Sequence, residues 1–447
     1  MIKIYDTMTR SLRDFVPLTE NVVNMYVCGP TVYNYIHIGN ARSTVAFDTI
    51  RRYFEYRGYT VNYISNFTDV DDKIIKAANE AGISTKELSD KFIAAFMEDT
   101  AQLGIKPATQ NPRVINYMDE IIAFVSTLVD KGFAYVSEGD VYFRVAKSKN
   151  YAKLANKTLE DLEIGASGRT DAETARKENP LDFALWKAAK EGEISWDSPW
   201  GPGRPGWHIE CSVMATEILG DTIDIHGGGA DLEFPHHTNE IAQSEAKTGK
   251  TFANYWMHNG FVNVDNEKMS KSLGNFVTVH DMLKTVDGQV LRFFLATQQY
   301  RKPINFTEKA IHDAEVNLKY LKNTHSLPLT GQVDQAELQT YLDAFQEAMD
   351  DDFNTANGVT VLFDMAKWIN SGNYDQTVKA AFEKMLQVFG IVFEEEVLDE
   401  DIEKLIEERQ AARANKDFAT ADRIRDELAA QGIKLLDTKD GVRWTRD

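Results

Sequence analysis

The chain of 447 residues is poor in cysteine, in long apolar stretches and in net positive charge. Its two cysteines exclude a disulfide-stabilised scaffold. No stretch approaches the roughly 18 consecutive apolar residues of a membrane span, which excludes an integral membrane protein. The first residues lack the apolar core and cleavage site of a signal peptide, so we expect a cytoplasmic protein. With 43% hydrophobic and 26% charged residues, the composition is that of a globular chain with several domains.

The net charge of −20 argues against a general polyanion binder, but the acidic residues are unevenly distributed. Residues 331–400 hold 3 basic and 15 acidic side chains, whereas residues 401–447 hold 10 and 11. In this last segment Arg409, Arg413 and Lys416 recur at the spacing of one helix face. Two interpretations are open: a solvated helix with alternating charges, or a local contact to nucleic acid.

Several segments indicate a parallel sheet. Residues 25–28 form a short strand pattern, a helical pattern begins near Asn40, and residues 59–64 alternate β-branched and aromatic side chains. Such strand–helix–strand units build parallel sheets. Residues 222–225 indicate a return to the sheet after a long insertion, and long helices follow residue 308. We therefore predict an α/β fold: a Rossmann-like parallel-sheet domain with an insertion, then an α-helical bundle and a small C-terminal mixed domain.

Four residues of metal-binding type stand far apart in the sequence: Cys28, Cys211, His236 and Glu240. The last two are four residues apart, which places them on one face of a helix that Pro235 would open. Two thiolates, an imidazole and a carboxylate suit Zn²⁺, and their spacing is too wide for a zinc finger. His237 is an equal candidate, because the residues alone do not choose between the two neighbouring histidines.

Two motifs of phosphate-binding type lie far apart in the chain. The first, His37-Ile38-Gly39-Asn40, falls where a strand turns into a helix. The free amides of a helix N-terminus attract phosphate, an imidazole there can donate a hydrogen bond to an α-phosphate, and a glycine lets an adenine ring approach the backbone. The second, Lys268-Met269-Ser270-Lys271-Ser272, places two lysines on a loop, which suits the charge of a triphosphate.

These paired motifs resemble the HIGH and KMSKS signatures of the class I aminoacyl-tRNA synthetases, and the whole chain resembles the cysteinyl-tRNA synthetase family. The resemblance extends over six segments: Cys28 to His37, Asn66 to Lys73, Asp182 to Lys187, Gly206 to Ser212, His226 to Glu240 and Lys268 to Asn275. It implies that ATP, with Mg²⁺, activates L-cysteine to cysteinyl-adenylate, and that tRNA(Cys) then receives the cysteinyl group. It also suggests a monomer.

The resemblance assigns the metal and amino-acid sites. It implies one Zn²⁺ per chain, held by Cys28, Cys211, His236 and Glu240, and thus selects His236 over His237. It places the substrate cysteine beside Cys28, Thr68 and Trp207. An apolar pocket discriminates between near-isosteres such as cysteine and serine by a factor of only about 10² in kcat/KM. Zinc, in contrast, binds a thiolate far better than a hydroxyl. Selection by the metal would therefore need no editing domain.

The resemblance also assigns the nucleotide site. It implies that ATP contacts Pro30, His37, Gly39, Asn40, Lys268 and Lys271. Four of these, namely His37, Asn40, Lys268 and Lys271, would stabilise the charge of the transition state. The sequence departs from the family pattern at Asn40, where the first signature usually has histidine. Because an amide still donates a hydrogen bond, we expect ATP binding to survive and more of the stabilisation to depend on His37.

The predicted domain organisation combines these patterns with the resemblance. In chain order we expect the first half of the catalytic domain at 1–120, an insertion at 121–200, the second half with the zinc site at 201–265, the KMSKS loop and stem-contact region at 266–307, a helical bundle at 308–396 and an anticodon-binding unit at 397–447.

Two other functions fit parts of the sequence. A ligase of the same fold that joins cysteine to an amino sugar in mycothiol synthesis would share the catalytic half, but it has no use for an anticodon reader. The charged C-terminal segment, with Trp444 near its end, favours the tRNA interpretation. A zinc-stabilised RNA-binding protein without catalysis is the second alternative, and the intact Lys268 to Ser272 motif argues against it.

Overall fold

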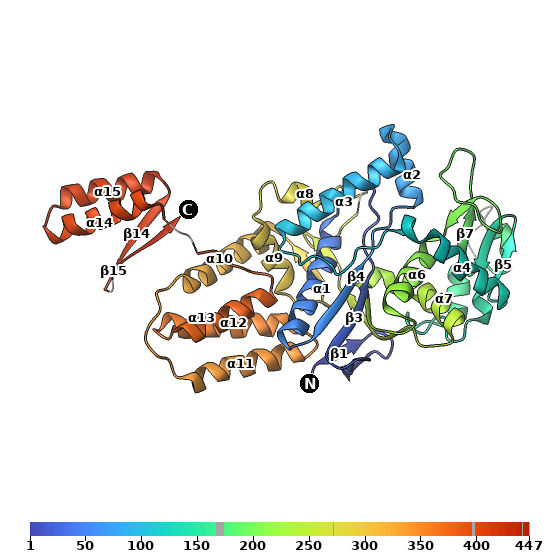
Figure 1. Cartoon of the computed structure of the whole chain (residues 1–447), viewed down its shortest axis with the longest axis horizontal. Coiled ribbons are helices and arrows are strands. Elements are labelled where there is room, and N and C mark those ends of the chain that lie inside the picture. Colours follow the sequence, from blue (N-terminus) through green and yellow to red (C-terminus); the bar gives the residue numbers. More distant parts are fainter. Residues whose placement is uncertain (167–173, 271, 396–397, 440, 447) are drawn as a thin grey trace. The chain divides into compact units, whose positions relative to one another are not determined.

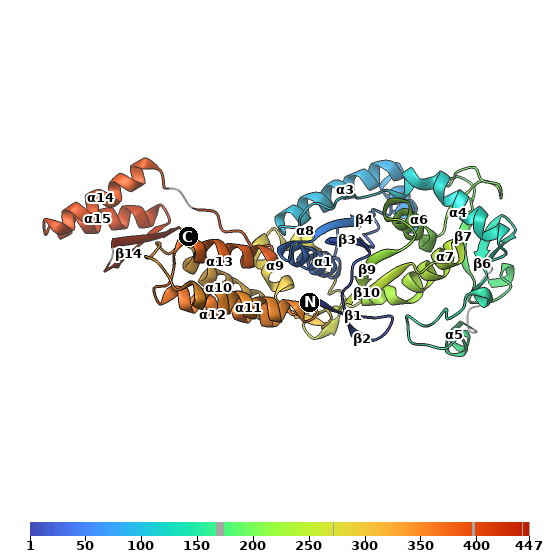
Figure 2. The same cartoon turned by 60° about the horizontal axis from the view of Figure 1, so that its bottom comes forward.

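The central sheet has four parallel strands in the order β10–β9–β3–β4. Their bounds are β3 (Val22–Val27), β4 (Thr60–Ser65), β9 (Ile223–Gly229) and β10 (Ala253–Asn259). Helix α1 (Ile38–Tyr56) connects β3 to β4 and packs against the sheet (Figure 2). Because β3 pairs with both β4 and β9, the strand order reverses beside β3, where open α/β sheets bind ligands at the carboxyl ends of their strands. The predicted Rossmann-like sheet is confirmed.

The computed structural model describes residues 1–166, 174–270, 272–395, 398–439 and 441–446. The chain divides into two units, Met1–Val392 and Phe393–Asp447 (Figure 1). Over the described ranges, every helix falls short of the length and apolar character that crossing a membrane needs.

A second sheet, antiparallel and in the order β5–β6–β7–β8, lies between the two halves of the parallel sheet in the sequence. Its strands are β5 (Ala134–Ser137), β6 (Asp140–Phe143), β7 (Phe183–Ala188) and β8 (Gly203–Pro205). The helices of this part of the chain are α2 (Asp72–Ala81), α3 (Thr85–Gln102), α4 (Met118–Asp130) and α5 (Leu159–Ala166). Helices α6 (Trp207–Leu219) and α7 (Thr238–Thr248) then flank β9 in the sequence.

The rest of the first unit joins a small sheet to a helical bundle. The sheet has the order β12–β11–β13, with β11 (Val262–Val264), β12 (Glu267–Lys268) and β13 (Ile304–Phe306). Two helices, α8 (Val279–Met282) and α9 (Gly288–Ala296), lie between β12 and β13 in the sequence. The bundle consists of α10 (Glu308–His325), α11 (Gln335–Asp350), α12 (Thr355–Asn370) and α13 (Gln376–Val388). At the N-terminus β1 (Lys3–Asp6) pairs with β2 (Ser11–Asp14).

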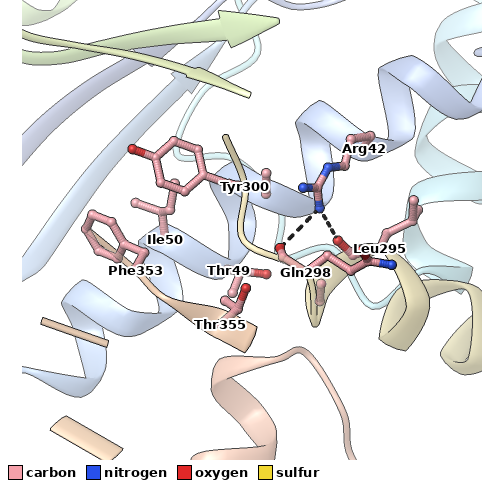
Figure 3. A pocket seen from close by; sticks show the side chains of 10 residues that line it. Arg42, Thr49, Ile50, Leu295, Gln298, Tyr300, Phe353 and Thr355 are labelled. Atoms are coloured by element: carbon pink, nitrogen blue, oxygen red, sulfur yellow. Dashed lines mark hydrogen bonds between the residues drawn. The ribbon is translucent and has the colours of Figure 1, made fainter. Parts of the chain in front are cut away.

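Two buried arginines connect α1 to later elements. Arg42 donates hydrogen bonds to the carbonyl groups of Leu295 and Gln298 at the end of α9 (Figure 3). Arg292 of α9 is fully buried and pairs with Asp48 of α1 at 2.6 Å. It also donates to the carbonyl oxygen of Phe389, just after α13. Since α1 begins at the first signature, these contacts fix the helix that carries it against the bundle.

The second unit packs two helices against a hairpin. Its elements are α14 (Glu400–Ala414), α15 (Phe418–Ala430), β14 (Ile433–Thr438) and β15 (Gly441–Arg446), and its core is formed by Leu398, Ile402, Ile424, Leu428 and Ile433. The expected stripe of three basic residues on one helix is wrong. Lys416 lies beyond the end of α14 with a left-handed backbone, and Arg409 is buried against Asp437 of β14, which also pairs with Arg413. Pairing with a strand residue is not visible in helical spacing.

Candidate active site

Four segments bring metal-binding side chains together at the carboxyl end of the parallel sheet. Cys28 directly follows β3, Cys211 lies on α6, His236 lies in the turn Glu233–His237, and Glu240 lies on α7. The Cys28 Sγ lies 3.7 Å from the Cys211 Sγ and 3.3 Å from the Glu240 Oε1. The His236 Nε2 lies 2.8 Å from the same Glu240 oxygen. The one difference from the expected geometry is that Pro235 lies in the turn before α7 and does not open the helix.

A second set of four ligand atoms overlaps the first. Cys28 and Glu240 also lie close to His226 and His237, and the ligand atoms of each set lie within 4.8 Å of one another. The His237 Nε2 is 3.4 Å from the Cys28 Sγ, and the His226 Nε2 contacts the Glu240 Oε2. The described residues thus contain a metal-binding cluster of Cys, His and Glu, within which two histidine arrangements are geometrically available.

The contacts around the two histidines differ. The His236 Nε2 is buried and faces the Glu240 carboxylate without an aligned hydrogen bond, as expected for an atom positioned to bind a metal. Its Nδ1 lies 2.9 Å from the Nδ1 of His208, which orients the ring. The His237 Nδ1 likewise lies against a histidine, 2.7 Å from the His258 Nε2, but the His237 Nε2 makes a hydrogen-bonding contact with the Cys28 Sγ at 3.4 Å. The donor set with two sulfurs, Cys28, Cys211, His236 and Glu240, therefore fits a thiophilic metal better.

The proton affinities of this cluster are shifted by burial and by its charges. Burial raises the pKa of the Cys28 thiol, and the neighbouring Cys211 raises it further. The hydrogen bond from Cys28 overcomes burial and lowers the pKa of Cys211 to about 6. Burial alone would lower the pKa of His236, but the facing Glu240 carboxylate outweighs burial and raises it to about 10. Without a metal, Cys28 and His236 therefore hold protons at neutral pH.

The residues predicted to contact the amino acid lie against this cluster. The Trp207 ring stacks on His236 with centroids 4.2 Å apart, and it remains 40% exposed. The Thr68 hydroxyl is buried and accepts a hydrogen bond from the Asn66 amide at 3.1 Å. The Asn66 Oδ1 in turn accepts from the backbone of Gly29, next to Cys28, at 2.9 Å. Trp207 thus contacts the ligand candidate His236 directly, whereas Thr68 is connected to the backbone beside Cys28 through Asn66.

The first signature folds into a reciprocal cap at the start of α1. The His37 Nδ1 accepts the Asn40 backbone N–H at 3.1 Å, and the Asn40 Oδ1 accepts the His37 backbone N–H at 3.2 Å. This capping box requires an unprotonated Nδ1, so the neutral ring carries its proton on Nε2. A side chain at Gly39 would meet the His37 ring at 2.9 Å. Asn40 therefore supplies the reciprocal acceptor of the cap, which accounts for an amide at this position.

The second signature is joined to the first by a short antiparallel ladder. The Ile38 N–H donates to the Val277 carbonyl at 3.1 Å, and the Val279 N–H donates to the Ile36 carbonyl at 3.0 Å. Phe276 places its ring edge against His37, with centroids 5.3 Å apart. Residues 36–38 and 277–279, more than 200 residues apart in the sequence, thus pair with each other. The first of these segments follows strand β3, which also leads into Cys28.

The lysines of the second signature are only partly described. Lys268 ends β12 and is exposed, with its ammonium 5.8 Å from the Phe261 ring. Lys271 lies outside the described residues. The Asn275 side chain connects the segment before α8 to the second signature: it accepts the Ser270 N–H at 2.8 Å and donates to the Lys268 carbonyl at 3.3 Å. Pro30, the remaining ATP-site candidate, accepts the Thr68 N–H through its carbonyl at 3.1 Å.

Sequence reasoning missed the histidines behind the ligand cluster. His226 and His258 are buried beside the cluster and His208 is partly buried there, and His226 contacts the Glu240 Oε2. The signal for His226 was its place directly before three glycines, which continue strand β9 to Gly229. His258 is the second-last residue of β10, and its Nδ1 lies 2.7 Å from the Thr7 hydroxyl. Neither His226 nor His258 stands at a regular sequence separation from the predicted ligands, so the spacing of residues in the sequence does not reveal them.

The comparisons with known proteins agree with this geometry. Residues 14–316 match the family described as tRNA synthetases class I (C) catalytic domain, and residues 344–394 match the DALR domain. Residues 395–444 match the Cysteinyl-tRNA ligase anticodon binding domain. The fold is similar to that of Mycobacterium tuberculosis methionyl-tRNA synthetase in complex with methionyl-adenylate, with a TM-score of 0.60 at 16% identity over 82% of this chain and 88% of that chain. The fold and the paired signatures define a class I aminoacyl-tRNA synthetase.

Curated relatives narrow the family within this class. The chain is 96% identical to the Cysteine--tRNA ligase of Streptococcus thermophilus strain CNRZ 1066, over 100% of both chains. It is 84% identical to the Cysteine--tRNA ligase of Streptococcus pyogenes serotype M6, again over 100% of both chains. The chain belongs to the cysteinyl-tRNA synthetase family.

Proposed function

We propose that this protein activates L-cysteine with ATP and transfers the cysteinyl group to tRNA(Cys), in the cytoplasm where translation takes place. The observation that carries this proposal is the meeting of two sites at one end of the sheet. Cys28, a metal-type ligand, follows β3 directly, and His37, the first residue of the nucleotide signature, opens the helix after it. We therefore infer that an amino acid held at the first site presents its carboxylate to a nucleotide held at the second.

We infer that Zn²⁺ is held by Cys28, Cys211, His236 and Glu240. This donor set suits zinc in number and softness, and the buried His236 Nε2 without an aligned hydrogen bond supports it. When bound, the ion supplies a coordination position that prefers a thiolate sulfur to the hydroxyl of serine. The chain's own contribution is orientation, because His226 and His208 contact the outer atoms of Glu240 and His236.

In the activation step, a carboxylate oxygen of cysteine attacks the α-phosphorus of ATP, and pyrophosphate leaves with Mg²⁺. The capping box orients the His37 Nε2–H as a donor for the charge that develops on the α-phosphate. Asn40 holds that geometry, and its amide N–H₂ is a further donor. We assign Lys268 and Lys271 to the triphosphate, and Pro30 and Gly39 to the adenosine side. No nucleophilic side chain is required.

In the transfer step, a ribose hydroxyl at the 3′ end of tRNA(Cys) attacks the cysteinyl carbonyl carbon, and AMP leaves. We assign residues 266–307 to contact with the stem of the tRNA and residues 397–447 to its anticodon. The match of residues 395–444 to an anticodon-binding domain supports this assignment. It also disfavours the amino-sugar ligase, which would have no anticodon to read. The full-length match to curated ligases disfavours a non-catalytic RNA-binding protein.

Cysteine-dependent exchange of pyrophosphate into ATP, followed by charging of tRNA(Cys), tests this function. We expect exchange with cysteine, essentially none with serine, and acceptance of the cysteinyl group by tRNA. Ligation of cysteine to an amino sugar without charging of tRNA would establish the rival ligase. Binding of tRNA without any exchange would establish the RNA-binding alternative.

The affinity of the metal is expected to rise with pH. Because the pKa of Cys28 is raised and that of His236 is about 10, both groups hold protons at pH 7 that the metal must displace. Two released protons correspond to a gain of about 100-fold in apparent affinity from pH 7 to pH 8. Competition titrations against a chelator, corrected for the chelator's own protonation, measure this slope. An affinity that does not change with pH would contradict the assigned ligands.

A further inference from the structure

Helix α8 directly follows the loop of the second signature and is only four residues long. A single turn of helix is not stable by itself, so contacts from other elements must hold it. Its N-cap, Thr278, accepts the Asp281 N–H at 3.2 Å, and Val279 and Met282 are buried. The side chain between them, His280, is 32% exposed and makes contacts of a different kind.

His280 joins three segments of the chain. Its Nδ1 lies 3.1 Å from the Asp99 Oδ1 on α3. Its ring stacks on Tyr35 with centroids 4.1 Å apart and planes 8° apart. Tyr35 lies two residues before His37 and is itself held by the edge of Phe92 on α3, at 5.2 Å. The start of α8 is thereby fixed to the segment that leads into the first signature.

We propose that His280 is a positioning residue for adenylate formation: with Tyr35 and Asp99 it fixes the base of the second signature loop beside the first signature. This inference rests on the proposed function. The loop is held at its start by pairing of Lys268 with Asn263, and at its end by the ladder with Ile36 and Ile38. The His280 cluster is the side-chain support of that second end.

The physical reason is one of accuracy. If both ends of the loop are fixed, the loop loses less conformational entropy when it adopts the one geometry that contacts the triphosphate. A small displacement of the loop, even far from the reacting atoms, lowers the reaction rate strongly. The transfer of cysteine from a finished adenylate to tRNA releases AMP and no longer requires contacts to pyrophosphate. His280 should therefore matter for the first step and not for the second.

The test compares His280→Ala with Lys284→Ala, a matched change on the same short segment. Lys284 is exposed and pairs with Asp281 at 2.9 Å, so its removal leaves the His280 cluster intact. For His280→Ala we expect the kcat of cysteine-dependent pyrophosphate exchange to fall about tenfold, with the KM for cysteine unchanged. Single-turnover transfer from preformed cysteinyl-adenylate to tRNA should stay at the rate of the unmodified protein in His280→Ala. Lys284→Ala should match the unmodified protein in pyrophosphate exchange, a step that does not involve the tRNA.

Two further variants separate positioning from general stability. His280→Gln keeps a side-chain N–H for Asp99 and should recover part of the exchange rate. The double variant Asp99→Asn with His280→Ala should raise the activation free energy of exchange by less than the sum of the two single variants. An equal loss in the transfer step, an additive double variant or an unchanged exchange rate in His280→Ala would overturn the proposal. Failure of the proposed function is distinguishable, because the unmodified protein would then show no cysteine-dependent exchange.

Discussion

Replacing His236 by alanine is expected to remove the bound metal and to lower cysteine-dependent pyrophosphate exchange on the order of 10³-fold, whereas His237→Ala should keep the metal. This loss of rate corresponds to an increase of several kcal/mol in the activation free energy, which is the stabilisation that a metal site supplies. The expectation follows from the contacts, because the His236 Nε2 faces Glu240 without an aligned hydrogen bond and the ligand set that contains His236 has two sulfur atoms. Metal content by elemental analysis and exchange kinetics measure the two effects.

His237→Ala also serves as the control for a general folding defect in His236→Ala. Both rings are buried in the same turn, so a general loss of packing should affect the two variants alike. His237→Ala should reduce exchange by no more than about 100-fold, the usual effect of an outer contact of a metal site. Loss of the metal from His237→Ala with retention in His236→Ala would instead select the set of Cys28, His226, His237 and Glu240.

Replacing His37 by asparagine is expected to lower the kcat of pyrophosphate exchange by about 10² to 10³, the usual cost of removing one donor to a developing oxyanion. Asparagine is among the preferred N-cap residues, so this variant keeps an acceptor for the Asn40 N–H and should keep the start of α1. It lacks the Nε2–H. Exchange kinetics give the change in rate, and thermal unfolding checks that the helix start is intact.

The matched variant for this experiment is His37→Ala, which removes both the donor and the cap. It should share the loss of rate and additionally cost about 1 kcal/mol of stability from the lost cap. Metal content should be unchanged in both variants, because neither residue of the cap belongs to the ligand set Cys28, Cys211, His236 and Glu240. A full exchange rate in His37→Asn would show that the imidazole acts only as a helix cap and would move the stabilising role to other groups.

The fold class was predictable because its signals are local. The strand ending at Val27, the helix opened by His37 and the alternation before Ser65 are each encoded in a few consecutive residues. The predicted parallel sheet followed from their order, since a strand–helix–strand unit has few ways to pack. Short-range hydrogen bonding explains the helix start most directly, because the capping box uses residues three apart.

Contacts between distant segments were not predictable in the same way. The spacing of Arg409, Arg413 and Lys416 suggested one helix face, but Asp437 of a later strand takes the two arginines and the helix ends before Lys416. The contact of His280 with Tyr35 and Asp99 likewise joins three segments with no shared pattern. Pairings of this kind depend on how the elements pack, which local spacing does not contain.

The sequence by itself determined the chemistry available to this protein: two thiols, a histidine and glutamate four residues apart, and two phosphate-binding motifs. It did not choose between His236 and His237, because both stand near Glu240 on any helical count. The tertiary structure brings both rings to the ligand cluster, with the His236 Nε2 2.8 Å from Glu240 and the His237 Nε2 3.4 Å from the Cys28 Sγ. We prefer His236 because only its set contains two sulfur ligands. Residue types fix which bonds can form, and packing of distant strands and helices decides which partners are left to form them.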